Sequence, residues 1–274
     1  VAAQCPGAEI VAEPSPKDSM AAIGLAAALL HARHGDTVIG SFAADHAIAD
    51  DDAFHNAVRA AIASAESGYV ATIGIAPTAP STAYGYIHAS QLNATGARPA
   101  LAFVEKPDSA TARAYLETGE YLWNAGMFVM RTSVLLGALA EREPELHRGL
   151  TTIAAAWDGE SRQDVLDDVW PSLPALVIDR AVAEPLAAEG RVTTVPASMG
   201  WSDVGDYAAL ADIAASPAHL EVDAPDSWVH ASKPVVIAGV PGAVVVEMDD
   251  LIFVTRLEEC GAKAASERIE EQLR

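Results

Sequence analysis

The sequence predicts an α/β protein with a mostly parallel sheet, followed by a small β-rich segment at its C-terminal end. Over roughly the first two hundred residues, apolar runs with the length of buried strands alternate with amphipathic helical patterns, as in βαβ units. The last stretch changes to short β-rich runs interrupted by Pro and Gly. With 51% hydrophobic residues, a chain of 274 residues can bury one sizeable core, with or without a small appendage.

The first two helix and strand pairs have the clearest patterns. The spacing of apolar residues predicts a helix over 19–35, with Ser19 as a candidate N-cap, and then a buried strand over 37–44. A second amphipathic helix is expected over 51–68, because an acidic run there suits the positive end of a helix dipole. A second strand is expected over 69–76.

The same patterns continue along the chain. They predict strands over 101–105, 124–131 and 191–197, and helices over 109–119, 132–150 and 203–216. Pro144 is expected to break the second of these helices. The composition changes near 217–226, so we expect a first domain over 1–217 and a small β-rich segment with a terminal helix over 218–274.

Charge and composition argue against several classes of function. A formal net charge of −21 disfavours nucleic acid and anionic membranes as partners, because both need a basic surface. No apolar run reaches the roughly eighteen residues of a membrane helix, and the first ten residues do not have a signal-peptide pattern. Cys5 and Cys260 lack the spacing of a disulfide framework or a zinc site, so a cytoplasmic location is expected. Phosphorylated small molecules stay open as ligands, because they need few cations.

Two aspartates stand where an open α/β sheet binds its ligands, beyond the carboxyl ends of strands. Asp45 follows the strand over 37–44, and Asp203 lies between a late strand and its helix. Either carboxylate could hold a hard cation such as Mg²⁺, which prefers oxygen ligands and phosphate partners. Each could equally be the cap of the following helix. Spacing does not decide between these readings.

The stretch FVEKP carries one of only four lysines in the chain. Pro107 favours an extended conformation at Lys106, so the side chains of Glu105 and Lys106 are expected to diverge. A carboxylate that accepts hydroxyl hydrogens and an ammonium that meets a phosphate would together recognise a sugar phosphate. The alternative is a surface salt bridge of little energetic weight.

Two further residues are candidates for a sugar pocket. Gly85, in the loop PTAPSTAYGYI, would let the backbone approach a ligand, although a lone Gly could also mark a bulge. Asn124, in WNAGMF, could both donate to and accept from a sugar hydroxyl, although a turn-forming Asn is the plainer interpretation.

Taken in order, these stretches resemble the nucleotidyltransferases that make sugar nucleotides, and within them the mannose-1-phosphate guanylyltransferases, or GDP-mannose pyrophosphorylases. Six matching runs cover roughly residues 11–210 in the family's order. They are AADHAIADDDAFHNAVRAA, TIGIAPTAPSTAYGYI, FVEKPD, YLWNAGMFVMR, VIDRAVAEP and GWSDVGDY. The resemblance implies a Rossmann-like, three-layer nucleotidyltransferase domain.

The resemblance also implies a reaction and a set of roles. GTP and mannose 1-phosphate would give GDP-mannose and pyrophosphate, by in-line attack that depends on positioning and charge neutralisation. Asp45 and Asp203 would hold Mg²⁺, and Lys106 would neutralise the sugar phosphate. Glu105 and Asn124 would read mannose hydroxyls, and the backbone at Gly85 would line the pocket.

The nucleotide end of the resemblance is less complete. Glu13 would accept from guanine, whose N1–H and amine form a donor pair that other bases lack. Lys17, Asp18 and Ser19 stand where these enzymes usually show Arg-Asn-Thr. No stretch matches the family's opening strand and Gly-rich loop, GGxGTRLWPLSR. Either the sequence is a fragment of a longer chain, or a variant lacks the triphosphate cradle; loss of that strand would expose core surface.

Two other functions stay open at this point. One is a nucleotidyltransferase with a different base or hexose, and the other is a non-catalytic regulatory protein that binds sugar nucleotides. The resemblance further suggests a homodimer that uses the C-terminal β segment for contacts.

Overall fold

The computed structural model of the chain describes residues 4–214, 216 and 219–257. Contacts divide the chain into two compact units. Unit 1 comprises residues 1–43 and 50–199, and unit 2 comprises residues 44–49 and 200–274. The division at 199/200 puts 200–217 with the β-rich part, whereas the sequence suggested a boundary near 217–226. The expected terminal helix and Cys260 lie outside the described residues.

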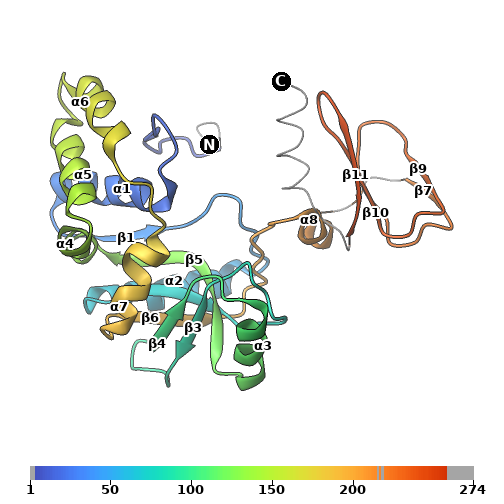
Figure 1. Ribbon diagram of the computed structural model, residues 1–274, viewed down its shortest axis with the longest axis horizontal. Helices are drawn as coiled ribbons and strands as arrows, with labels where there is room; N and C mark the ends of the chain where they lie inside the picture. Colours follow the sequence, from blue (N-terminus) through green and yellow to red (C-terminus); the bar gives the residue numbers. More distant parts are fainter. Residues whose placement is uncertain (1–3, 215, 217–218, 258–274) are drawn as a thin grey trace. The chain divides into compact units, whose positions relative to one another are not determined.

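Unit 1 is built on a six-stranded sheet (Figure 1). Its spatial order is β1-β5-β2-β6-β4-β3, and β5 also pairs with β3. The strands are β1 (Val38–Ser41), β2 (Val70–Ile75), β3 (Tyr86–Ala89), β4 (Arg98–Val104), β5 (Tyr121–Arg131) and β6 (Val192–Ala197). The strand β3 was not predicted, because its four residues lie in a stretch that Pro and Gly mark as a loop.

Strand direction and strand pairing differ in this sheet. Strands β1, β2, β3 and β6 run in one direction, and β4 and β5 run in the other. Among the hydrogen-bonded neighbours, β2 and β6 are parallel, with Val70 opposite Val192. The other pairs are antiparallel, because each of them includes β4 or β5, which run against the other strands. The α/β fold class is therefore confirmed, with most strands running the same way.

One face of the sheet is covered by α1 (Asp18–His34), α4 (Thr132–Arg142) and α5 (Pro144–Ala156) (Figure 1). The break at Pro144 is confirmed, because Pro begins α5 at a position that needs no N–H donor. The same core includes α6 (Arg162–Val169), the 3₁₀ turn η1 (Trp170–Ser172), the π-helix η2 (Asp179–Ala183) and α7 (Glu184–Ala188). Its largest buried side chains include Trp157 and Trp170.

The opposite face of the sheet is covered by α2 (Asp51–Glu66). The hydroxyl groups of Ser64 and Thr193 lie 2.7 Å apart, which places α2 on the face that carries Thr193. Val192, the preceding residue of β6, belongs to the core that contains α1. Because successive residues of a strand face opposite sides, the sheet is a middle layer between helices, as the three-layer expectation required. A shorter helix, α3 (Ser109–Thr118), packs near β5.

Helix caps agree with the sequence in α2 and differ in α1. The side chain of Asp50 accepts a hydrogen bond from the backbone N–H of Ala53 at 2.9 Å, so the acidic run does begin a helix. Ser19 does not cap α1, whose N-cap is Lys17 with no side-chain bond. The hydroxyl of Ser19 accepts instead from the backbone N–H of Ile178 at 3.0 Å. It therefore ties α1 to the segment that leads into η2.

Strand β1 forms one edge of the sheet, and within the described residues its outer edge has no partner strand. An apolar groove of about 300 Å³ runs along it, and Phe42 in this groove is 42% exposed. The groove is lined by Ala22, Ile23, Ala26 and Leu30 of α1 and by Ile39, Gly40, Ser41 and Phe42. Apolar surface is therefore exposed at this edge of the sheet.

Unit 2 has a short helix, α8 (Tyr207–Ile213), and two small sheets. One sheet has the order β11-β10-β8, and the other pairs β7 with β9. The strands are β7 (Leu220–Val222), β8 (Trp228–His230), β9 (Val236–Ala238), β10 (Ala243–Glu247) and β11 (Ile252–Arg256). Trp228 and Val244 are buried against Tyr207 and Leu210 of α8. The predicted β-rich character of this part is confirmed.

Candidate functional site

The loop after β4 holds Glu105 and Lys106 side by side. The Nζ of Lys106 lies 3.3 Å from Oε1 of Glu105, with the lysine side chain 59% exposed and the glutamate 11% exposed. The expected extended backbone at Lys106 is wrong, because its φ is 48°, in the left-handed region. That conformation costs a non-glycine residue about 1–2 kcal/mol. It turns the ammonium back over Glu105, so the two side chains converge instead of diverging.

The carboxylate of Glu105 is held against Gly85. A Cβ placed on Gly85 would lie 2.7 Å from Oε2 of Glu105, so a side chain there would push the carboxylate away. The backbone carbonyl of Gly85 accepts from the backbone N–H of Asn124 at 2.8 Å. The backbone N–H of Glu105 donates to Oε1 of Glu184, the first residue of α7, at 3.0 Å. The carboxylate of Glu105 therefore lies next to Gly85, which is bonded to Asn124, and the backbone of Glu105 is bonded to α7.

A bulge in β5 sets the position of Asn124. Asn124 faces Gly74 and Phe128 faces Thr72, so β5 holds extra residues over the same length of β2. Gly126 lies in this bulge with φ 69°, a conformation that glycine adopts without strain. Its backbone N–H donates to Oδ1 of Asn124 at 3.2 Å. With this bulge, the amide of Asn124 lies within hydrogen-bonding distance of Asp179 in η2.

Asp179 is a member of this cluster that the sequence reasoning did not single out. The Nδ2 of Asn124 donates to Oδ1 of Asp179 at 2.8 Å. Burial and the negative charge of Glu105 raise the pKa of Asp179 to about 6, against lowering by its own backbone N–H, Lys106 and Asn124. Asp179 and Glu184 both lie in VIDRAVAEP, a matching run with no strand end to draw attention to them. Their place in η2 and α7 was not predicted.

The two predicted metal carboxylates lie in unit 2 on adjacent segments. Ala47 and Ser202 form an isolated antiparallel bridge, with N–H···O distances of 2.8 and 3.0 Å. Asp45 lies two residues before Ala47, and Asp203 directly follows Ser202. Residues at opposite ends of the chain's matched region are thus brought together by backbone pairing.

The plainer interpretation of these aspartates as helix caps does not hold. The N-cap of α2 is Asp50, not Asp45. The N-cap of α8 is Asp206, whose side chain accepts from the backbone N–H of Ala209 at 2.9 Å, so Asp203 lies before the helix. Val204, directly after Asp203, has φ 49°. A β-branched residue in that region is a conformational outlier, and such strain is concentrated at functional sites.

An aromatic contact holds the same two segments of unit 2 together. The indole Nε1–H of Trp201 donates to Nδ1 of His46 at 3.2 Å, and the two rings meet edge to face at 5.4 Å. Because Nδ1 accepts, the proton of the neutral imidazole is on Nε2. The residues next to Asp45 and Asp203 are therefore themselves in contact.

The donor set of this part of unit 2 fits Mg²⁺ better than a softer metal. Its candidate ligands are two carboxylates, which are hard oxygen donors. Within the described residues no group of three or more His, Cys, Asp or Glu side chains could hold a metal. Two carboxylates are a typical protein ligand set for Mg²⁺, whose remaining coordination positions are usually filled by waters and substrate phosphates.

Glu13 lies apart from these clusters in the described contacts. It is exposed and belongs to no strand or helix. Burial of part of its carboxyl raises its pKa. Nearby, Nζ of Lys17 donates to the carbonyls of Pro171 and Leu173 at 2.8 and 2.7 Å. Lys17 thus anchors the segment that follows Glu13 to η1.

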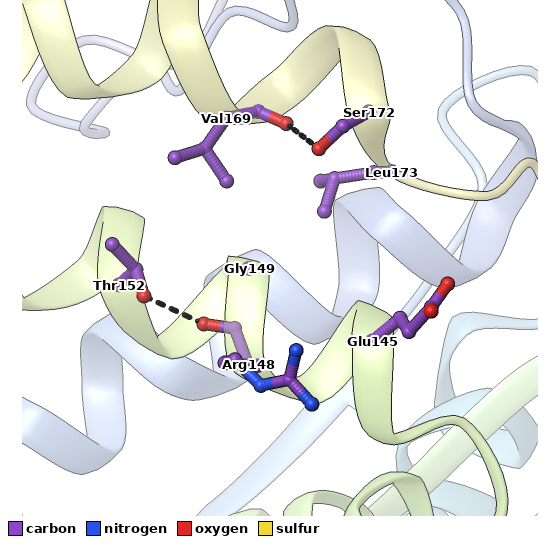
Figure 2. A pocket seen from close by; sticks show the side chains of 7 residues that line it. All are labelled: Glu145, Arg148, Gly149, Thr152, Val169, Ser172 and Leu173. Atoms are coloured by element: carbon purple, nitrogen blue, oxygen red, sulfur yellow. Dashed lines mark hydrogen bonds between the residues drawn. The ribbon is translucent and has the colours of Figure 1, made fainter.

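A separate open pocket of about 400 Å³ lies between α5 and the η1 region, as Figure 2 shows. It contains none of the predicted site residues. The hydroxyls of Thr152 and Ser172 already donate to backbone carbonyls, those of Arg148 and Val169, at 2.8 and 2.7 Å. The pocket is lined by Glu145, Arg148, Gly149, Thr152, Val169, Ser172 and Leu173. Its chemistry suggests no specific ligand.

A family model described as nucleotidyl transferase matches residues 4–219. The chain belongs to the nucleotidyl transferase family. This match covers both the cluster around Glu105 and the segments that carry Asp45 and Asp203. The described helices include none with the length and apolar character that crossing a membrane requires.

Within the nucleotidyl transferase family, the similar proteins include sugar-nucleotide enzymes. The chain is 38% identical over 257 residues to xanthan biosynthesis protein XanB of Xanthomonas campestris pv. campestris (strain B100), covering 89% of this chain and 53% of that protein. It is 36% identical over 262 residues to the mannose-1-phosphate guanylyltransferase of Escherichia coli (strain K12), covering 89% and 54%. The chain thus spans about half the length of the curated relatives it matches.

A solved structure resembles nearly the whole chain. It is a crystal structure titled "mannose-1-phosphate geranyltransferase" from Thermus thermophilus, with a TM-score of 0.84 and 28% identity. The alignment covers 97% of this chain and 79% of that one. The nucleotidyl transferase fold inferred from the sequence is therefore confirmed.

Proposed function

We propose that this chain is the nucleotidyltransferase part of a mannose-1-phosphate guanylyltransferase, which converts GTP and mannose 1-phosphate into GDP-mannose and pyrophosphate. The observation that carries the proposal is the cluster around Glu105. An exposed ammonium stands beside a nearly buried carboxylate, at a point where Gly85 leaves the backbone open. This is the chemistry that a sugar phosphate needs, with one cation for the phosphate and acceptors for the hydroxyls. The names of the similar proteins support mannose as the sugar.

The reaction can be assigned to the residues of the chain without a covalent intermediate. A phosphate oxygen of mannose 1-phosphate attacks the α-phosphorus of GTP; the new P–O bond forms as the bond to the β-phosphate breaks, and pyrophosphate leaves. Lys106 offsets the charge of the attacking phosphate and orients it. Glu105 accepts hydrogen bonds from sugar hydroxyls, and the backbone at Gly85, which leaves room for the Glu105 carboxylate, lines the sugar pocket.

Asp45 and Asp203 are proposed as the protein ligands of Mg²⁺, which would supply charge neutralisation at the reacting phosphates when bound. The pairing of their segments through Ala47 and Ser202 supports this assignment. Direct ligands would lie about 2.0–2.1 Å from the ion. Glu13 is retained as a proposed guanine acceptor, on chemical grounds alone. A homodimer and a cytoplasmic location also stay predictions.

The experiment that tests the proposal is Mg²⁺-dependent release of pyrophosphate. GTP, ATP, UTP and dTTP are each paired with mannose 1-phosphate or glucose 1-phosphate, both for this chain and for its full reading frame. Release confined to GTP with mannose 1-phosphate supports the proposal. Release with another pair moves the assignment to a different base or hexose. GDP-mannose binding without release from any pair indicates a regulatory binding protein instead.

A further inference from the structure

Asn124 has little hydrogen-bonding capacity left for a ligand. It is 7% exposed, and its Oδ1 accepts from Oγ1 of Thr72 at 2.6 Å and from the backbone N–H of Gly126 at 3.2 Å. Its Nδ2 donates to Asp179 at 2.8 Å. A carboxamide has two acceptor lone pairs and two donor hydrogens. Both acceptor positions are filled, so Asn124 can offer a sugar at most one hydrogen and cannot accept from a hydroxyl.

These bonds fix the orientation of the amide and of its partner. Because Thr72 and Gly126 both donate to the oxygen of Asn124, the NH₂ group must point to Asp179. The acceptor there is a carboxylate, which has two oxygens and about four lone-pair sites. Asn124 uses one of these sites. Hydrogen bonds therefore link Thr72 of β2 to Asn124 of β5 and Asn124 to Asp179 of η2. The Asp179 carboxylate at the end of this series can accept further hydrogen bonds.

Asp179 also lacks a cation of its own. The ion pairs among the described residues include Lys106 with Glu105 and none with Asp179. The charged groups that face it are Glu105 and Lys106 from the loop after β4, and its pKa is raised toward neutrality. A partly buried carboxylate without a counter-ion is unfavourable for folding. Such groups occur where a ligand supplies the missing hydrogen bonds.

We infer that Asp179 is a sugar-binding residue, which accepts hydrogen bonds from the hydroxyls of a hexose 1-phosphate, and that Asn124 is a positioning residue which orients it. The inference rests on the proposed function, and it changes the role expected for Asn124. Glu105 and Asp179, which lie on different elements of unit 1, then both accept hydrogen bonds from hydroxyls of the same sugar. Lys106 binds the phosphate of the same ligand.

The test compares Asp179→Asn with the unchanged 274-residue chain. Asparagine keeps the shape, and its carbonyl oxygen can still accept from Asn124, but the negative charge is lost. We expect the Kd of mannose 1-phosphate, measured by calorimetry at pH 7.5, to rise at least tenfold, with GTP affinity changed less than twofold. Asp168→Asn, which changes an exposed carboxylate of α6, is the matched control and should leave both affinities unchanged.

A pH series separates binding by Asp179 from a structural effect. GDP-mannose is the probe, because its phosphates are diesterified and do not titrate near pH 6. The affinity of the unchanged chain should fall as the pH drops through about 6, where Asp179 takes up a proton. Asp179→Asn should bind weakly with a flat profile across this range. A pH dependence that persists in Asp179→Asn would come from another group and would contradict the inference.

A second variant tests the positioning role. Asn124→Ala leaves the carboxylate in place but unoriented, so mannose 1-phosphate should bind less tightly than in the unchanged chain and more tightly than in Asp179→Asn. If Asn124→Ala abolishes binding and Asp179→Asn retains it, the roles are reversed and the inference is overturned. If the alanine variant does not fold, as judged by circular dichroism, Asp179→Asn decides alone.

Failure of the inference and failure of the proposed function give different results. If the unchanged chain binds mannose 1-phosphate and Asp179→Asn binds it equally well, with the same pH profile, the inference is wrong and the function stands. If the unchanged chain binds no mannose 1-phosphate, and its full reading frame releases no pyrophosphate, the proposed function falls and this inference falls with it.

Discussion

The Nζ of Lys106 lies 3.3 Å from Oε1 of Glu105, although the two residues are neighbours in the chain and a proline follows them. Side chains of adjacent residues in an extended strand would point to opposite faces. The left-handed backbone at Lys106 brings them to the same side. The contact therefore depends on a strained residue, and the bond from the backbone N–H of Glu105 to Glu184 ties this loop to α7.

Replacing Lys106 with alanine should affect one substrate far more than the other. Its ammonium is proposed to bind the phosphate of mannose 1-phosphate, so KM for that substrate should rise at least tenfold. KM for GTP should stay within about twofold. Lys233→Ala is the control, because that lysine is 83% exposed and lies 3.9 Å from Glu247 in unit 2. Steady-state kinetics with each substrate varied in turn gives the answer, and equal effects on both substrates would contradict the assignment.

Gly85→Ala is expected to damage the site without damaging the fold. The new methyl group would lie 2.7 Å from Oε2 of Glu105, which is the end of a flexible side chain and can move away. Mannose 1-phosphate affinity should therefore drop at least fivefold, while the free energy of unfolding changes by less than about 1 kcal/mol. Gly137→Ala in α4 is the matched control, because nothing lies within 4 Å of its added methyl. The free energy of unfolding of Gly137→Ala should increase by up to about 1 kcal/mol, because alanine favours a helix more than glycine does. A stable Gly85→Ala variant with normal affinity would remove Glu105 from the site.

The raised pKa of Asp179 predicts a pH-dependent change in stability. Its folded-state pKa of about 6 exceeds the ordinary value of 3.8, so the ionised carboxylate destabilises the folded state above pH 6. Asp179→Asn should therefore raise the free energy of unfolding at pH 7.5, by about 2 kcal/mol after allowance for partial exposure. The gain should shrink as the pH falls from about 6 toward 4, because Asp179 is then protonated in the folded state and the unfolded carboxyl approaches its own value of 3.8. Urea unfolding at pH 7.5 and pH 4.5 measures both effects, with Asp168→Asn as the control.

Trp201→Phe should lower the affinity of the protein for Mg²⁺. The substitution keeps an aromatic ring but removes the N–H that donates to Nδ1 of His46, next to Asp45. Loss of a bond that orients a metal-binding segment typically lowers metal affinity about tenfold or more. The Mg²⁺ concentration for half-maximal pyrophosphate release should rise accordingly. Trp228→Phe is the control in the same unit, because its indole N–H donates at 3.1 Å to the carbonyl of Ala214. An unchanged Mg²⁺ requirement in Trp201→Phe would contradict the proposal that the bond to His46 orients a metal-binding segment.

Asp45→Asn and Asp203→Asn should each abolish most Mg²⁺-dependent release of pyrophosphate. If both carboxylates bind one ion, removal of either disables the same site, so the double variant should be hardly worse than the single ones. Initial rates over a series of Mg²⁺ concentrations compare each single variant and the double variant with the unchanged chain. Effects that multiply in the double variant would indicate two independent roles.

The elements that the sequence predicted correctly are those whose signal is local. The apolar period of α2 and the acidic run at its start, the break at Pro144 and the apolar run of β2 all lie within a few residues of the structure they specify. The insertion of β5 between β1 and β2 is different in kind. Strand pairing joins residues far apart in the chain, and periodicity holds no information about it.

The same distinction explains the candidate site. Gly85, Glu105, Lys106 and Asn124 were found because each stands next to an apolar run, where ligands of α/β sheets collect. Asp179 was missed because it lies inside a helical stretch, and its importance arises from a bond to Asn124. The left-handed backbone of Lys106 was also missed, since the local preference imposed by Pro107 is outweighed by contacts to other elements.

The open edge of β1 bears on how the chain behaves in concentrated solution. Among the described residues no strand pairs with the outer edge of β1, and this edge, next to the exposed ring of Phe42, forms a template on which an extended segment of another molecule can pair. Molecules of this chain are therefore expected to associate through that strand as their concentration rises. Solubility, more than the stability of the buried core, would then govern how concentrated a sample can become.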